Sequence, residues 1–188
     1  MNTEGLRFDV NCSILFTELP LLKRPGAARA AGFGAVEFWW PFSGPVPGDR
    51  EVDAFTAAAG ATVVVEALNS YDSPHAALVS SRRALEVVNL VRTQAGVTNV
   101  AFLADLYHLG KMGEDLPGLL IRHADNIAHI QIADVPDRGA PGTGELDFEA
   151  LFGQLAAQGY DGWVGCEYKP SDPADSSTSF GWRERDEV

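Results

Sequence analysis

Short apolar runs of strand character alternate with longer segments of helical period along the whole chain. The apolar character of the runs is continuous, which is typical of strands that are covered on both faces. The six strand-like runs are residues 8–15, 35–40, 62–68, 97–106, 127–133 and 162–168. This order predicts an α/β fold of parallel βα repeats around a single sheet.

Helix-like segments lie between these runs, at residues 19–31, 50–59, 77–94, 116–125 and 148–158. The last is the best defined, because Asp147 is suited to cap its start and Gly159 to end it in a left-handed conformation. The first contains Pro25 followed by Gly26, and we expect this pair to break or kink it.

The 188 residues, 46% of them apolar, are enough for the core of one domain. No low-complexity linker divides the chain, so residues 1–170 are predicted to form this domain. Residues 171–188 lose the apolar period and are predicted to form a polar C-terminal tail. We expect the tail to be loosely packed or partly disordered, unless Phe180 and Trp182 anchor it.

The chain is acidic, with 14 Lys and Arg residues against 26 Asp and Glu residues and a formal net charge of −12. This charge argues against nucleic acid and against anionic membrane surfaces as partners. No apolar run approaches the roughly 18 residues of a membrane-spanning helix, and the polar N-terminus does not resemble a signal peptide. A cytoplasmic location follows as the expectation. Cys12 and Cys166 are interpreted as two reduced thiols, with a single bridge left open.

Four polar side chains interrupt the apolar runs late in their predicted strands: Glu66, Asp105, Gln131 and Glu167. They are 39, 26 and 36 residues apart, close to the length of one βα repeat. Successive parallel strands would therefore bring all four to one rim of the sheet, at the carboxyl ends of the strands. Each residue taken singly is explained as well by an ion pair or a helix cap.

Three carboxylates and an amide that meet at one rim would repel one another unless a cation lay between them. An all-oxygen ligand set suits Mg²⁺ or Mn²⁺ better than zinc. Such an ion can hold a substrate carbonyl and its neighbouring hydroxyl and stabilise an enediolate. Two ligand carboxylates on opposite sides of the substrate could then exchange a proton with adjacent carbons.

Other residues near the strand ends allow two interpretations each. His108 could donate a hydrogen bond to a substrate oxygen or lie exposed in a loop. Arg138 could bind a substrate carboxylate or form a surface pair with Asp137. Glu37 could be a hydrogen-bond partner of the site or a strand residue that faces a helix cation. Aromatic side chains after the second strand could line a pocket or simply pack, namely Trp39, Trp40 and Phe42. The remaining histidines, His75, His123 and His129, are interpreted as structural or solvated.

Several segments together carry a resemblance to a known family. They include Glu-Ala-Leu-Asn at 66–69, Asp-Leu-Tyr-His at 105–108, His-Ile-Gln-Ile-Ala at 129–133, Val-Pro-Asp-Arg at 135–138, Gly-Thr-Gly-Glu-Leu at 142–146 and Gly-Tyr-Asp-Gly-Trp at 159–163. With them the chain resembles the hydroxypyruvate isomerase family, within the xylose isomerase-like β/α barrels. The glycine-rich loop is shared widely in that superfamily, whereas the strand of Gln131 followed by Val-Pro-Asp-Arg is typical of this branch.

The resemblance implies a TIM-barrel-like fold and a set of functional residues. The family's divalent metal ligands, for Mg²⁺ or Mn²⁺, fall on Glu66, Asp105, Gln131 and Glu167. Glu66 and Glu167 would be the catalytic acid/base pair. The substrate-binding positions fall on His108, Arg138 and Asp72. The implied reaction interconverts hydroxypyruvate and 2-hydroxy-3-oxopropanoate through an enediol, without a redox cofactor.

The chain departs from the family pattern in its number of repeats. A complete barrel has eight βα units, whereas this sequence shows about six strands, as though the third and fourth units were missing. The ligand residues remain, but part of the barrel wall does not. Two alternatives therefore stay open: a ketose epimerase or isomerase of the same superfamily that acts on a sugar, and a catalytically degenerate binding protein. The open strand edges also make a homo-oligomer one outcome to test.

Overall fold

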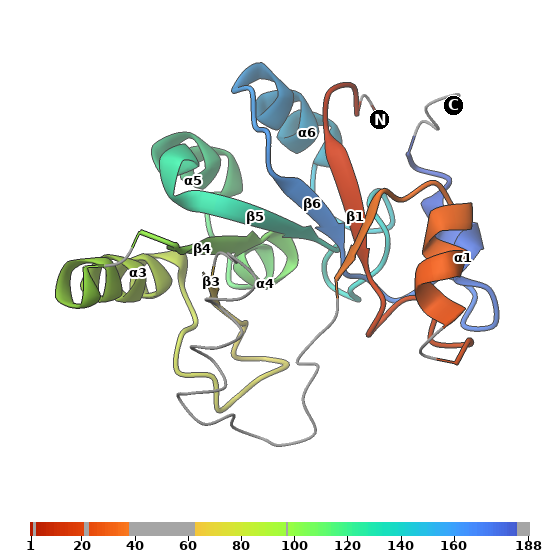
Figure 1. The fold of residues 1–188 in the computed structure, drawn as a ribbon, viewed down its shortest axis with the longest axis horizontal. Helices are drawn as coiled ribbons and strands as arrows, with labels where there is room; N and C mark the ends of the chain where they lie inside the picture. Colours follow the sequence, from red (N-terminus) through yellow and green to blue (C-terminus); the bar gives the residue numbers. More distant parts are fainter. Residues whose placement is uncertain (2, 21–22, 38–62, 97, 184–188) are drawn as a thin grey trace.

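The computed structural model describes residues 1, 3–20, 23–37, 63–96 and 98–183. Six parallel strands form one sheet in the order β2-β1-β6-β5-β4-β3. Their bounds are β1 (Arg7–Asn11), β2 (Ala35–Glu37), β3 (Val63–Glu66), β4 (Val100–Asp105), β5 (Ile127–Ile132) and β6 (Trp163–Cys166). The predicted parallel α/β architecture is confirmed, and Figure 1 shows the strands as a curled half-barrel.

The strand order places β2 and β3 at the two ends of the sheet. These strands flank the point in the sequence where two βα units are expected to be missing. The predicted helix at residues 50–59 and the aromatic residues Trp39, Trp40 and Phe42 lie outside the described residues. The half-barrel therefore keeps its consecutive strands in the arrangement that a complete barrel would give them.

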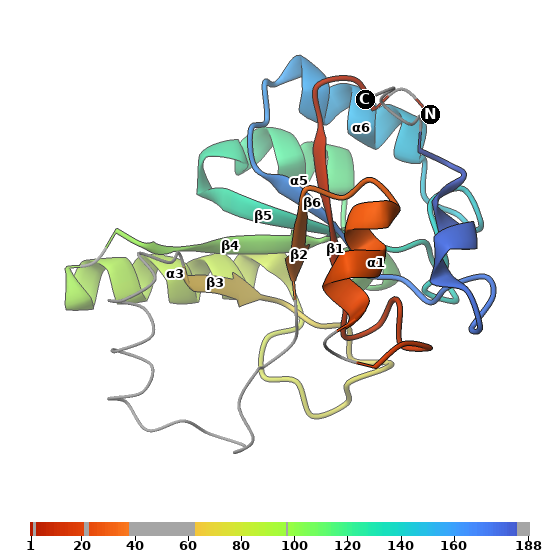
Figure 2. The same cartoon turned by 45° about the vertical axis from the view of Figure 1, so that its right-hand side comes forward.

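Helices pack along the sheet between the strands that they connect (Figures 1 and 2). The α-helices are α1 (Arg24–Ala30), α3 (Ser81–Ala95), α4 (Leu106–Lys111), α5 (Leu116–Arg122) and α6 (Phe148–Ala157). Two short 3₁₀ segments are η2 (Ala124–Asn126) and η3 (Ser176–Phe180). α3 packs against β3 and β4, α4 against β5 and α1 against β2. In the part of the chain that the structure describes, no helix is long and apolar enough to cross a membrane.

The ends of the helices follow from local sequence. Asp147 accepts a hydrogen bond from the backbone N–H of Ala150, and Gly159 has a φ of +68°, as predicted for α6. The predicted helix at residues 19–31 is interrupted near Pro25 as expected, because α1 begins at Arg24 and places Pro25 in its first turn. Proline is tolerated there, since the first backbone N–H groups of a helix have no partner within the helix.

Alternate strand residues divide the sheet into an apolar outer face and a polar inner face. The outer face is buried under the helices and includes Val10, Phe102, Ile130 and Val164, each with 0% exposure. Cys12 and Cys166 are buried and free, which confirms the interpretation as two thiols. The polar residues of interest therefore lie on the inner, concave face of the half-barrel.

The segment after β6 packs onto the domain through its aromatic residues. Phe180 is buried, and the Trp182 ring lies 5.5 Å from that of Phe8 in an edge-to-face arrangement. The Trp182 indole N–H donates to the Tyr168 hydroxyl, which donates to the Ser179 carbonyl oxygen. The expectation of loose packing is therefore wrong for residues 171–183, and the aromatic pair anchors this stretch.

Candidate active site

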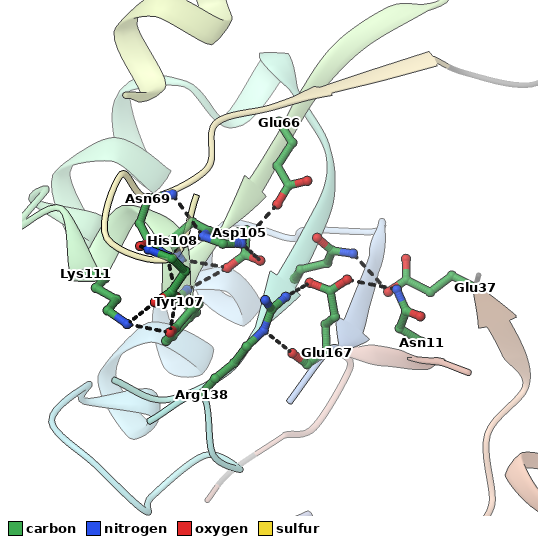
Figure 3. Close-up of polar contacts among 12 residues, drawn as sticks. Asn11, Glu37, Glu66, Asn69, Asp105, Tyr107, His108, Lys111, Arg138 and Glu167 are labelled. Carbon is green, nitrogen blue, oxygen red and sulfur yellow. Dashed lines mark hydrogen bonds and ion pairs between the residues drawn. The ribbon is translucent and has the colours of Figure 1, made fainter. Parts of the chain in front are cut away.

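The strand-end residues predicted from the sequence lie on the inner face at one rim (Figure 3). Glu66 ends β3, Asp105 ends β4, Gln131 lies near the end of β5 and Glu167 follows β6. A pocket of about 290 Å³ opens beside them. It is lined by Glu66, Leu68, Asp72, Ser73, His108, Arg138 and Glu167. The βα spacing thus correctly predicts that residues far apart in the sequence share this rim.

Asp105 organises the turn that follows β4. It is 2% exposed, and its Oδ1 accepts hydrogen bonds from the backbone N–H groups of Tyr107 (2.8 Å) and His108 (3.0 Å). These bonds cap α4, a helix that the sequence analysis did not predict. The cap turns His108 inward, where it is 3% exposed, so the alternative of a solvent-exposed loop histidine is wrong. The capping potential of Asp105 was the available signal for this helix.

His108 is buried in its neutral form, with one ring nitrogen facing the carboxylates. Its Nδ1 accepts a hydrogen bond from the backbone N–H of Asn69 at 3.0 Å. Burial, together with the nearby Arg138 guanidinium, lowers the pKa of His108 to about 4. The hydrogen-bond network therefore assigns the ring proton to Nε2, which lies 3.8 Å from carboxylate oxygens of Glu66 and Asp105.

The acidic groups at the rim disfavour one another's charged forms. Burial and the Glu167 carboxylate raise the pKa of Glu66 to about 7. Burial, followed by Glu66 and Glu167, raises the pKa of Asp105 well above its usual value. Carboxylate oxygens of Glu66 and Asp105 lie close to each other, each 3.8 Å from the same His108 Nε2 atom. This geometry favours a bound cation, because a positive charge between the carboxylates would remove their repulsion.

Glu167 is fixed from two sides (Figure 3). Its Oε1 accepts from the Asn11 side-chain amide at 2.9 Å, and its Oε2 forms an ion pair with the Arg138 guanidinium at 2.5 Å. Arg138 Nε also donates to the backbone carbonyl of Glu167. The alternative of a surface pair between Arg138 and Asp137 is therefore wrong. Asn11 is a residue of the site that the sequence analysis did not single out.

Gln131 presents an amide oxygen that has no partner in the described part of the chain. Its Nε2 donates to Glu37 Oε1 at 3.1 Å, so the Oε1 atom of Gln131 is left buried without a hydrogen bond. Glu37 is thus a hydrogen-bond partner of the site, the first of the two interpretations given above. A buried acceptor without a donor is costly, and a cation ligated by this oxygen would satisfy it.

Asp72 lies at the mouth of the pocket in a network of its own. Its Oδ2 accepts from the Tyr107 hydroxyl (2.6 Å) and the Asn69 amide (2.9 Å), and its Oδ1 pairs with Lys111 at 2.8 Å. Burial opposes ionisation of Asp72, but these hydrogen bonds outweigh it and hold its pKa below the usual value. Both carboxylate oxygens of Asp72 are therefore engaged by protein groups. Asn69, Tyr107 and Lys111 are members of the network that sequence spacing did not reveal.

Comparison with known proteins gives consistent similarities. A family model described as "Xylose isomerase-like TIM barrel" matches residues 46–184. A putative hydroxypyruvate isomerase of Streptomyces coelicolor is 37% identical over 265 aligned positions, which cover 94% of this chain and 95% of that protein. Hydroxypyruvate isomerase of Escherichia coli is 41% identical over 108 residues, covering 57% of this chain and 40% of that protein.

Among solved structures, the crystal structure of an AP endonuclease, family 2, from Brucella melitensis superposes with a TM-score of 0.81. The two sequences are 28% identical, and the superposition covers 94% of this chain and 97% of that chain.

The alignment with the Streptomyces protein shows how much shorter this chain is. It spans 265 positions but includes 94% of 188 residues, which is about 177, so roughly 88 positions have no residue of this chain. That length agrees with two missing βα units of 30 or more residues each.

Proposed function

The chain belongs to the xylose isomerase-like TIM barrel family, and from this membership we propose that it is a metal-dependent isomerase that interconverts hydroxypyruvate and 2-hydroxy-3-oxopropanoate. The observation that carries the proposal is the rim, where three acidic side chains raise one another's pKa beside a Gln131 amide oxygen that has no hydrogen bond from any described residue. Relatives at this level of identity are named isomerases, which supports the reaction class.

We assign Glu66, Asp105, Gln131 and Glu167 as the residues that would hold a divalent cation. Carboxylate and amide oxygens are ligands suited to Mg²⁺ or Mn²⁺. The pKa of Asp105 stays raised even though the Arg138 guanidinium lowers it, so a further positive charge would stabilise the ionised carboxylates. The Gln131 oxygen, which has no hydrogen bond among the described residues, would also gain a partner. When bound, such an ion supplies Lewis acidity that lowers the pKa of the C–H bond next to a substrate carbonyl.

The reaction moves one proton from C3 to C2 of the three-carbon acid, and one hydroxyl proton from O3 to O2. Glu66 and Glu167 are proposed as the acid/base pair, one removing the C3 proton and the other delivering a proton to C2. Asn11 and Arg138 fix the orientation of Glu167 for this step.

The remaining pocket residues bind and orient the substrate. The Arg138 guanidinium lines the pocket and has the planar donor geometry that recognises a carboxylate. His108, neutral and protonated at Nε2, is placed to donate a hydrogen bond to a substrate oxygen. Asp72 supports this end of the pocket by holding Tyr107 and Lys111 in place.

A nucleic-acid substrate, which the name of the Brucella endonuclease would suggest, fits this chain poorly. Binding to DNA depends largely on Lys and Arg side chains that neutralise phosphates. The net charge here is −12, and the pocket lining contains one arginine and three carboxylates. A small anionic acid needs only the single guanidinium of Arg138.

The test is turnover by the metal-loaded protein, followed by proton NMR in D₂O. We expect exchange of the C3 hydrogen of hydroxypyruvate with solvent and formation of the aldehyde isomer. Glu167→Gln should lower kcat by about 10² to 10⁴, the usual contribution of general acid–base catalysis. Glu86→Gln, the same change on the exposed face of α3, is the matched control and should leave kcat unchanged.

Two outcomes would contradict the proposal. One is a metal-loaded wild-type protein that binds hydroxypyruvate without exchanging its C3 hydrogen, which would favour a binding protein. The other is a Glu167→Gln variant with wild-type kcat. A panel of ketoses, compared by kcat/KM, separates a three-carbon acid from a sugar as the preferred substrate.

A further inference from the structure

A second group of ionisable side chains lies on the inner face of the sheet, apart from the residues that line the pocket. It consists of Asp9 on β1, Glu37 on β2 and His129 on β5. Each offers one ligand atom, and the three atoms lie within 4.8 Å of one another. The sequence analysis did not single out Asp9, and it interpreted His129 as structural or solvated.

The three side chains surround a small space above Gly165 of β6. A Cβ atom placed on Gly165 would lie 2.8 Å from Glu37 Oε1, 3.0 Å from His129 Nε2 and 3.1 Å from Asp9 Oδ1. These are the nearest atoms to that point, so the three donor atoms gather over Gly165. Because Gly165 has no side chain, the donor atoms can lie close to its backbone, and any other residue would push its Cβ against them. An ion held by the three atoms would lie farther from the Gly165 Cα than this Cβ position.

Two of the three atoms around this space have no hydrogen bond among the described residues, whereas Glu37 Oε1 accepts one from Gln131. Asp9 is 5% exposed, and its Oδ1 has no hydrogen-bond partner among the residues that the structure describes. His129 Nε2 lies 3.2 Å from Glu37 Oε2, but in an orientation that makes no hydrogen bond. Buried polar atoms are normally paired, and unpaired ones call for an explanation such as a bound ion.

We propose that Asp9, Glu37 and His129 form a second cation site, which binds a divalent transition-metal ion such as Zn²⁺. Carboxylate oxygens and imidazole nitrogens both bind zinc, and a water molecule can take its fourth position. The three ligand atoms lie within 4.8 Å of one another, and zinc–ligand bonds are about 2.0–2.2 Å long, so each atom needs to move toward a common centre by roughly 1 Å or less. Rotation of the side chains is sufficient for such a movement.

This site would also support the rim. Glu37 Oε1 faces the centre of the cluster and accepts the hydrogen bond from Gln131 Nε2. An ion that fixes Glu37 therefore fixes the amide of Gln131, whose other atom, Oε1, is turned away from this bond. The second site is thus a positioning site for a proposed ligand of the first, and its occupancy does not depend on whether the isomerase proposal holds.

The experiment measures Zn²⁺ binding by isothermal titration to protein freed of metal with a chelator. Asp105→Asn removes a ligand from the rim, and this variant should still bind one equivalent of Zn²⁺. Adding Asp9→Asn should lower the affinity for this one equivalent of Zn²⁺ by more than about 100-fold. Loss of a hydrogen-bond partner of a metal ligand already costs about 10–100-fold in affinity, and loss of the ligand itself should cost at least as much. Asp147→Asn, a change at the exposed cap of α6, is the matched control.

A spectroscopic measurement identifies the ligands directly. Zinc-edge X-ray absorption of the Asp105→Asn protein should show an imidazole ligand, and His129→Gln should remove it. Gly165→Ala, which pushes a methyl group against the three donor atoms, should also abolish binding, with circular dichroism as the check on its fold. The proposal is overturned if Asp105→Asn binds no zinc, or if Asp9→Asn binds it as tightly as before. Neither readout uses turnover, so failure of the isomerase proposal is recognised separately.

Discussion

Asp134, directly after β5, holds a loop of the rim through three hydrogen bonds. It is 1% exposed, and its Oδ2 accepts from the backbone N–H groups of Gly142 (3.0 Å) and Gly144 (2.8 Å). Its Oδ1 accepts from the backbone N–H of Leu146 at 3.0 Å. One buried carboxylate therefore organises the glycine-rich loop at residues 139–146.

Replacing Asp134 by Asn removes part of this support without changing the shape of the side chain. The amide keeps one acceptor oxygen, and in its better orientation this oxygen accepts from Gly142 and Gly144 while the NH₂ group faces the N–H of Leu146. Hydrogen bonds to a charged group are each worth about 1.5–3 kcal/mol, so the loss of the bond from Leu146 costs about 1.5–3 kcal/mol. The free energy of unfolding of a domain is only about 5–15 kcal/mol, so the variant should be clearly destabilised.

Urea denaturation followed by circular dichroism measures this difference, compared between wild type and variant at the same m-value. Asp147→Asn is the control, because Asn caps a helix as well as Asp does and the free energy of unfolding should change by less than about 0.5 kcal/mol. A loss below about 1 kcal/mol for Asp134→Asn would show that the loop does not depend on this carboxylate.

Two further predictions concern the core. Phe180→Ala should lower the free energy of unfolding by about 3–5 kcal/mol, because the ring is buried with its centroid 4.8 Å from that of Phe33. Leu90→Ala on the exposed face of α3 is the control and should lower the free energy of unfolding far less in the same urea titration. Burial raises the pKa of the Cys12 thiol to about 11, so stability should fall as the pH rises from about 8.5, the ordinary thiol value, toward 11. Cys12→Ala should reduce this alkaline loss, and an unchanged profile would contradict the assignment.

The strands are predictable from the sequence because their apolar runs are continuous. The residues at which the strands end are not predictable in this way. The run at residues 8–15 predicts one strand, whereas β1 ends at Asn11. Leu15 and Phe16 are buried by packing in the following turn, and apolar character alone does not distinguish this from a strand. α4 was not predicted because Leu106, its first residue, continues the apolar run of β4 and was assigned to the strand.

The rim is predictable because its residues recur at the spacing of one βα repeat. Asp9 and Glu37 are 28 residues apart, also close to one repeat, but the sequence analysis did not single out Asp9 or connect His129 with them. The group of these three residues forms because β1 and β5 both pair with β6, which places Gly165 beside Asp9 on one side and Gln131 on the other. This neighbourhood depends on the strand order of the folded sheet, which residue spacing along the chain does not contain.

The hydrogen bond from Gln131 on β5 to Glu37 on β2 reaches across β6 and β1, the two strands that lie between them. The distance between its two ends therefore depends on how strongly the sheet is curved. Flattening the sheet would stretch this contact, and tightening the curl would compress it. The position of the Gln131 amide at the rim thus depends on the curvature of the sheet.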